Sequence, residues 1–152
     1  MSKLKEGDKA PDFTAKDQNG NSISLSDYKG KTVILYFYPK DDTPGCTAEA
    51  CDFRDNYQSL IGKGFQVIGV STDDEKSHKK FETKYNLPFP LVADPGKEIN
   101  EAYGVWVEKN MYGRKYMGTA RVTFIINGDG IIQKMIEKVD TKAASQQVLD
   151  AL

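Results

Sequence analysis

Six consecutive apolar and aromatic residues, Val33–Tyr38, constrain the fold of this chain more than any other feature of its sequence. A strand with one face in water alternates apolar and polar residues, whereas an unbroken apolar run is typical of a strand buried on both faces. We therefore expect Val33–Tyr38 to lie in the centre of a sheet. Both faces of such a sheet must be covered by other elements, as they are in α/β folds.

Helical and strand patterns alternate after this run. Thr43 and Pro44 are typical of a helix entrance, and the helix is expected to continue to about Leu60. A second buried strand, an amphipathic helix, a short strand and a short helix follow, at 65–74, 74–87, 89–94 and 96–105. Strands that alternate with helices predict a mixed sheet with helices on both of its faces.

The two ends of the chain complete the expected fold. Asn19 and Gly20, between two short alternating segments, predict an N-terminal β-hairpin. Residues 106–120 are expected to form a loop, which leads to two strands joined by the turn "NGDG". The last segment is expected to be a helix that Asp140 or Thr141 caps.

Length and charge narrow the class of protein. A chain of 152 residues has the usual size of one domain, so we expect a single domain over residues 1–152. The net charge is −1, and the interleaved acidic and basic residues exclude the basic surface that binds nucleic acids or membranes. No segment approaches the ~20 apolar residues of a membrane span, and the start "MSKLKEGDKAPDF" lacks a signal-peptide core. We therefore expect a cytoplasmic protein.

The only two cysteines, Cys46 and Cys51, lie in the stretch "PKDDTPGCTAEAC". Cys46 follows the carboxyl end of the predicted central strand and lies at a helix start, where parallel sheets place functional residues. A cysteine reacts as a thiolate, and both a helix N-terminus and a guanidinium group favour that form. The pair could nevertheless be a structural staple, a metal clip, two inert core residues or a reactive pair.

A metal clip is not predicted. Structural zinc requires four ligands, and beyond the two thiols this chain offers only His78, on what its pattern predicts as the polar face of a helix. A thioredoxin-like redox pair has two residues between its cysteines, and this pair has four. Asp41 and Asp42 would disfavour a nearby thiolate, so we expect them to face solvent. Inert buried cysteines remain an open alternative.

The spacing of Cys46 and Cys51 predicts a conformational switch. Within one α-helix, five residues rotate the chain by ~500°, which leaves the two side chains ~140° apart and their Cα atoms separated by ~8–9 Å. A disulfide requires Cα atoms within ~7 Å of each other. The two cysteines can therefore bond only after the first turns of the helix unwind.

Pro39, Thr43 and Cys46 match the P-x3-T-x2-C signature of the peroxiredoxins. The chain resembles most the subfamily called bacterioferritin comigratory protein, or Q-type, an atypical two-cysteine group whose second cysteine often follows five residues after the first. The segments "GDKAPDF", "FQVIGVSTDD" and "MYGRKYMGTARVTFIING" also resemble landmarks of that family, so the resemblance covers nearly the whole chain.

The resemblance implies a thioredoxin-like fold and assigns roles to single residues. Cys46 would be the peroxidatic cysteine, which becomes a sulfenic acid, and Cys51 would be the resolving cysteine. Arg121, in "ARVTF", completes the active-site set together with Thr43 and Pro39. Glu49 also matches a family position, and it could pair with and orient Arg121 or be an ordinary acid in the first turns of a helix.

The resemblance further implies a thiol-dependent peroxidase of hydrogen peroxide and alkyl hydroperoxides. Thioredoxin or a similar dithiol protein would reduce the disulfide, and neither a metal nor an organic cofactor would be needed because sulfur carries the chemistry. A monomer is expected, with a dimer as the alternative. A non-catalytic redox sensor that uses the Cys46–Cys51 disulfide is the alternative function, and a structural protein with inert thiols is the third.

Overall fold

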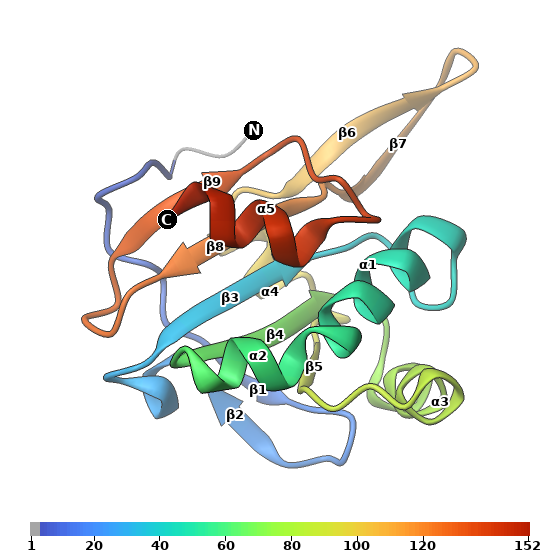
Figure 1. Cartoon of the computed structure of the whole chain (residues 1–152). Coiled ribbons are helices and arrows are strands. Elements are labelled where there is room, and N and C mark those ends of the chain that lie inside the picture. The colour runs from blue at the N-terminus through green and yellow to red at the C-terminus, as the bar shows by residue number, and fades with distance from the viewer. Residues whose placement is uncertain (1–3) are drawn as a thin grey trace.

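A computed structural model describes residues 4–152 and shows a seven-stranded mixed sheet with a separate two-stranded hairpin (Figure 1). The strand order in the large sheet is β2-β1-β5-β4-β3-β8-β9, and β6 pairs with β7 in the hairpin. The first three residues of the predicted domain lie outside the described residues.

The apolar run forms the central strand, as predicted. β3 (Thr32–Phe37) pairs in parallel with β4 (Phe65–Ser71) on one side and antiparallel with β8 (Val122–Ile126) on the other. Because alternate residues of a strand point to opposite faces, Leu35 packs into the core on one side of the sheet and Tyr36 into the core on the other. The central position of β3 explains why its sequence has no polar face.

The remaining strands form the edges of the large sheet. β1 (Thr14–Lys16) and β2 (Ser22–Ser24) form the predicted N-terminal hairpin, with β1 joined to β5 (Leu91–Ala93). β9 (Ile132–Ile136) pairs antiparallel with β8 at the opposite edge.

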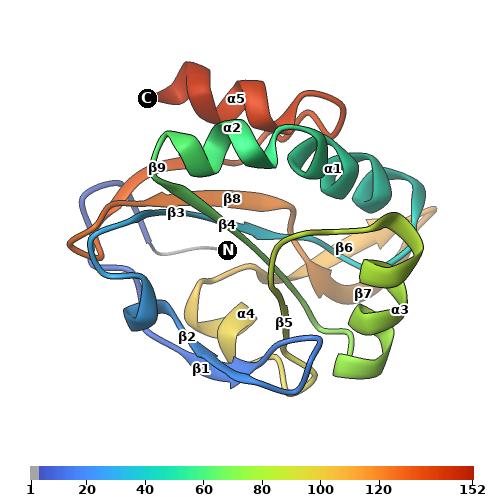
Figure 2. The ribbon, with the colours of Figure 1, turned by 60° about the horizontal axis from the view of Figure 1, so that its bottom comes forward.

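Helices lie on both faces of the sheet, as the alternating pattern predicts. One face is covered by α1 (Pro44–Asp55), α2 (Tyr57–Gly62) and α5 (Ala144–Ala151), and the short helix α4 (Glu98–Ala102) lies on the other face (Figure 2). The 3-10 helix η1 (Leu25–Tyr28) follows β2, and α3 (Glu75–Tyr85) packs beside β5. Among residues 4–152, no helix is long and apolar enough to cross a lipid bilayer.

The helix predicted to run to Leu60 is in fact two helices. α1 ends at Asp55, Asn56 has φ −108° and ψ 5°, and α2 begins at Tyr57. The Asn56 side chain donates to the carbonyl of Asp52 at 2.8 Å. Asparagine side chains compete in this way with the backbone for helix carbonyls, which explains the break.

The prediction of a loop at 106–120 is wrong, because this segment forms the hairpin of β6 (Trp106–Met111) and β7 (Arg114–Thr119). Tyr112 and Gly113, with φ of 53° and 80°, make a two-residue turn with positive φ at both positions. The hairpin projects from the body of the molecule (Figure 1). Most of its side chains are exposed, so its sequence lacks the apolar alternation of a half-buried strand.

The N-terminus of α5 is capped by another helix rather than by the predicted Asp140 or Thr141. Its N-cap residue is Ala143, whose methyl group cannot accept a hydrogen bond. The carboxylate of Asp52, in α1, accepts from the backbone N–H of Ser145 at 2.8 Å and so replaces the cap.

Candidate active site

Cys46 lies in the first turn of α1, directly beyond the carboxyl end of β3, where the sequence places it. Thr43 is the N-cap residue and Pro44 is the first helical residue. Cys46 is 1% exposed and packs within the core that β3 and α1 share. Its sulfur is therefore almost fully removed from water and lies at a helix N-terminus, whose backbone N–H groups carry partial positive charge.

Arg121 links Cys46 to Glu49. It precedes β8, whose residue Val122 pairs with Phe37 at the end of β3. One guanidinium nitrogen, Nη2, donates to Cys46 Sγ at 3.3 Å, and Nη1 donates to Glu49 Oε1 at 2.7 Å. Of the two possibilities that the sequence leaves open for Glu49, the contact with Arg121 is present, and the same guanidinium also contacts the sulfur.

The pKa values of both members of the Glu49–Arg121 pair are raised, which favours the neutral form of the carboxyl group and the charged form of the guanidinium. Glu49 is fully buried, and this burial raises the pKa of its carboxyl to about 7, although Arg121 acts in the opposite direction. Burial disfavours the Arg121 charge, but the Cys46 sulfur and Glu49 more than offset this and hold the Arg121 pKa above its ordinary value. Glu49 Oε2 has no hydrogen-bond partner among residues 4–152. A proton can therefore bind or leave Glu49 near neutral pH.

The Thr43 hydroxyl has a defined direction. Its side chain makes no capping hydrogen bond to α1, although Thr43 is the N-cap residue. The hydroxyl instead donates to the backbone carbonyl of Lys40 at 2.8 Å. Its hydrogen is thereby engaged, and the oxygen keeps its lone pairs for accepting a hydrogen bond. Pro39, half-buried, directly follows Tyr38 and opens the loop that leads to Thr43.

Cys51 lies in the same helix as Cys46 and is half-buried. Both thiols are free. In an intact α-helix their separation exceeds the reach of a disulfide, so the structure describes the form in which α1 has not unwound.

Gly45 is a site residue that the sequence reading missed. A Cβ atom at this position would lie 3.2 Å from Nη2 of Arg121, the nitrogen that contacts the sulfur. Glycine therefore leaves the space through which the guanidinium reaches Cys46. Its place between a helix-start proline and the cysteine was the only signal in the sequence.

Lys109 is a second residue that the sequence reading missed, because it lies on β6 in the segment predicted as a loop. Its aliphatic stem lies over Gly118, where an added Cβ would be 3.2 Å from the Lys109 Cδ. Burial lowers the pKa of Lys109, Arg121 lowers it further, and Cys46 acts in the opposite direction. Lys109 is thus a second positively charged residue that interacts electrostatically with Cys46.

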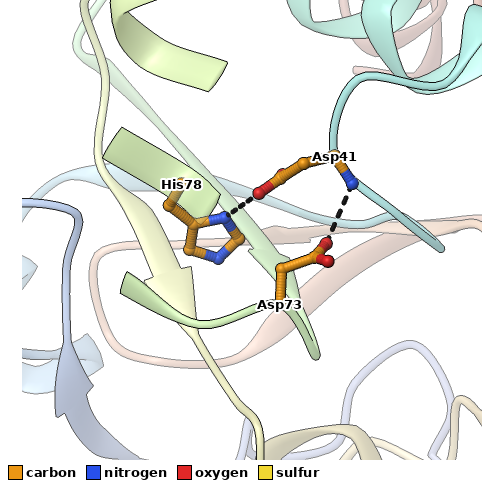
Figure 3. Close-up of side chains that lie close together, drawn as sticks. All are labelled: Asp41, Asp73 and His78. Atoms are coloured by element: carbon orange, nitrogen blue, oxygen red, sulfur yellow. Dashed lines mark hydrogen bonds and ion pairs between the residues drawn. The ribbon is translucent and has the colours of Figure 1, made fainter. Parts of the chain in front are cut away.

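The predictions for Asp41 and His78 are wrong. Asp41 is buried rather than solvent-facing, and His78 is fully buried rather than on a polar helix face. His78 shares its helix face with Phe81, three residues later, and this face packs inward. Asp42, in contrast, is exposed and pairs with Lys84. Within residues 4–152, one group of side chains, Asp41, Asp73 and His78, brings three potential metal-ligand atoms within 4.8 Å of one another (Figure 3).

Comparison with known proteins identifies the family of this chain. Residues 6–135 match the model of the AhpC/TSA family. Peroxiredoxin Bcp of Bacillus subtilis is 47% identical over 146 residues, which cover 96% of this chain and 93% of that protein. This chain is a peroxiredoxin of the AhpC/TSA family. Peroxiredoxin Bcp of Escherichia coli K12 is 41% identical over 152 residues, which are 100% of this chain and 97% of the relative.

Solved structures of peroxiredoxins share the whole fold. A cysteine-to-serine mutant of PrxQ from Xylella fastidiosa has a TM-score of 0.92 and 32% identity, with 99% of this chain and 96% of that chain covered. The bacterioferritin comigratory protein of Xanthomonas campestris has a TM-score of 0.90 and 33% identity, with the same shares covered. The predicted thioredoxin-like α/β fold is therefore confirmed, and the peroxiredoxin has the thiol-dependent peroxidase activity of its family.

Proposed function

We propose that Cys46 is the nucleophile of this peroxidase. Its thiolate attacks one oxygen of the peroxide, the S–O bond forms as the O–O bond breaks, and water or an alcohol leaves after taking up a proton. Cys46 becomes a sulfenic acid. The observation that carries this proposal is the hydrogen bond from Arg121 Nη2 to the Cys46 sulfur at 3.3 Å. The guanidinium stabilises negative charge first on sulfur and then on the departing oxygen.

The neighbouring side chains support this step in different ways. Thr43 Oγ, whose own hydrogen is engaged by Lys40, accepts a hydrogen bond from the peroxide hydroxyl and so aligns the O–O bond with the sulfur. Glu49 holds the guanidinium through Nη1 and leaves Nη2 for the reacting atoms. Pro39 has no backbone N–H and shields the thiol without adding an unpaired donor.

Cys51 is proposed to resolve the sulfenic acid. After the first turns of α1 unwind, the Cys51 thiol attacks the Cys46 sulfur, the S–O bond breaks, a disulfide forms and water leaves. The separation of the two residues in one helix supports this order, because bonding requires the unwound form.

Thioredoxin or a similar dithiol protein is proposed as the reductant, and the cytoplasm as the compartment. The two thiols of the reductant are oxidised to a disulfide as the Cys46–Cys51 disulfide is reduced. Hydrogen peroxide and alkyl hydroperoxides are the proposed substrates, a choice supported by the alkyl peroxide reduction activity named for the Xanthomonas campestris relative. The protein is proposed to work as a monomer.

Intact mass measurement after one equivalent of peroxide, without reductant, tests the assignment. The wild type should lose two hydrogen atoms as the disulfide forms. The Cys51→Ser variant should gain one oxygen atom, and Cys46→Ser should not change. Gain of an oxygen atom by Cys46→Ser contradicts the role of Cys46. Normal turnover of Cys51→Ser with thioredoxin contradicts the role of Cys51.

A coupled assay separates the peroxidase from the redox-sensor alternative. Sustained NADPH consumption with peroxide, thioredoxin and thioredoxin reductase indicates catalysis. A disulfide that forms once without sustained NADPH consumption indicates a sensor.

A further inference from the structure

His78, the only histidine of the chain, has both ring nitrogens in defined hydrogen bonds. It is fully buried, with Nδ1 2.6 Å from Oδ2 of Asp41 and Nε2 3.0 Å from the backbone carbonyl of Val92. Figure 3 shows the imidazole facing the Asp41 carboxylate. Because a carbonyl oxygen only accepts hydrogen bonds, Nε2 must carry a hydrogen.

The surroundings of Asp41 decide where the second proton lies. Its Oδ1 accepts from the Tyr38 hydroxyl at 2.6 Å, and its Oδ2 accepts from the Ser77 hydroxyl at 2.8 Å. Donors on both oxygens stabilise the charged form of a carboxyl group. They favour a hydrogen on Nδ1 of His78 in the 2.6 Å contact. With the hydrogen on Nδ1, the two side chains form a buried imidazolium–carboxylate pair, which is neutral as a whole.

The arrangement does not suit a metal ion, although Asp41, Asp73 and His78 lie close together. The Oδ2 atom of Asp73 already accepts from the backbone N–H of Asp41 at 2.9 Å and from the Ser71 hydroxyl at 2.7 Å. A metal would have to displace these donors and the proton on Nδ1. The contacts instead hold the chain around Asp41 in place.

The peptide group between Lys40 and Asp41 connects this cluster to the active site. Its N–H donates to Asp73, and its C=O accepts from the Thr43 hydroxyl at 2.8 Å. The peptide group is planar and trans, so its N–H and C=O point in opposite directions and turn together. Fixing the N–H on Asp73 therefore fixes the direction of the Lys40 carbonyl, and with it the direction of the Thr43 hydroxyl hydrogen.

We propose that the buried His78–Asp41 ion pair, together with Asp73, is a positioning unit that orients the Thr43 hydroxyl oxygen to accept a hydrogen bond from the peroxide. The inference rests on the proposed reaction of Cys46 with peroxide. The unit joins β4, α3 and β5 to the loop before α1, so it remains assembled when α1 unwinds. It therefore acts on the peroxide step and leaves the resolution step unchanged.

The protonation state is tested by nitrogen-detected NMR of the wild-type protein. One histidine gives one unambiguous set of ring signals. Both ring nitrogens should show the protonated signature at neutral pH in the reduced, folded protein. A neutral ring with an unprotonated Nδ1 would place the proton on Asp41 and overturn the ion pair.

The positioning role is tested by a double-mutant cycle of Asp41→Asn and Thr43→Val. Asp41→Asn keeps the size of the side chain, removes its charge and replaces one acceptor oxygen with an NH2 donor. We expect it to lower the second-order rate of Cys46 oxidation about tenfold, a loss in line with misplaced substrate-positioning groups. In the Thr43→Val background it should have no further effect. Equal losses in both backgrounds, or a loss confined to disulfide formation, would overturn the proposal.

Two further variants control the test. Asp42→Asn removes the charge of an exposed salt bridge between the same loop and Lys84 of α3. Cys46 of this variant should be oxidised at the wild-type rate. Ser77→Ala removes one donor to Asp41 and serves if Asp41→Asn does not fold; its smaller loss should again disappear in the Thr43→Val background. A wild type that does not react with peroxide refutes the proposed function, whereas equal rates for wild type and a folded Asp41→Asn refute only the positioning unit.

Discussion

The backbone N–H of Ser145 donates to the Asp52 carboxylate at 2.8 Å, so the first turn of α5 is held by a side chain of α1. The Ser145 hydroxyl also donates to the backbone carbonyl of Asp52 at 3.3 Å. Asp52 is the residue after Cys51. The chain directly beyond the second cysteine is therefore attached to the body of the protein by contacts that do not depend on the first turns of α1.

Replacing Asp52 with alanine should destabilise the protein by about 1 kcal/mol, because α5 loses the acceptor that replaces its N-cap side chain. For a chain of this size the melting temperature should fall by about 2–4 °C. Calorimetry or circular dichroism measures the shift. Asp52→Asn keeps an acceptor oxygen and should melt close to the wild type, and equal losses in the two variants would contradict the capping role.

Lysine should not be able to replace Arg121 in the oxidation of Cys46. The guanidinium contacts the sulfur through one nitrogen and Glu49 through another, and a lysine ammonium cannot span both. Arg121→Lys should therefore lower the rate of Cys46 oxidation on the order of 100-fold, nearly as much as Arg121→Ala. Stopped-flow measurement of the oxidation rate checks this, with the exposed Arg114→Lys as a control that should react normally. Normal reactivity of Arg121→Lys would show that charge alone suffices.

Lys109→Met should stabilise the protein and slow the peroxide step. Burial and Arg121 both disfavour the Lys109 charge, so removing it should raise the melting temperature at neutral pH. The same substitution removes a cation from the field of Cys46, so oxidation should slow severalfold. Lys115→Met, on the exposed partner strand, is the matched control and should alter neither property. A stable variant with wild-type kinetics would leave Lys109 without a role at the site.

Glu49 should give the stability of the protein a distinct pH dependence. Its pKa rises from the ordinary 4.5 to about 7 on folding, so the folded protein binds this proton more tightly than the unfolded chain. The free energy of unfolding should therefore fall between about pH 4.5 and pH 7, by on the order of 3 kcal/mol from this group, and not change further above that range.

Urea denaturation of wild type and Glu49→Gln across that pH range measures this contribution. The variant cannot ionise at position 49, so its curve should lack the decline, while the exposed Glu137→Gln should retain it. Parallel curves for wild type and Glu49→Gln would mean that Arg121 keeps the carboxyl ionised throughout.

Local sequence signals were sufficient for the elements whose residues face the core. The continuous run of β3 specified a central strand, and Asn19–Gly20 specified the first hairpin. The β6–β7 hairpin was missed because its stability does not come from a buried apolar face, and its turn places a tyrosine at positive φ, where glycine or asparagine is usual.

Some residues of the candidate site could likewise be predicted from the sequence, and others could not. Pro39, Thr43 and Cys46 lie close enough in the sequence to form a recognisable motif, and the resemblance to the peroxiredoxins pointed to Arg121. Lys109 could not be predicted, because it lies in the β6–β7 hairpin, which the sequence pattern does not reveal. His78 was misjudged because its helix is polar overall, and a histidine is buried there only through partners distant in sequence.

Trp106, at the base of the β6–β7 hairpin, is the only tryptophan of the chain. It pairs with Thr119, two residues before Arg121, and the Lys97 ammonium lies 5.3 Å from the centre of its ring. The protein therefore carries a single tryptophan, and its strand partner lies two residues before Arg121. Recording its emission during oxidation and reduction would show, without any label attached to the thiols, whether this part of the protein responds to the state of Cys46.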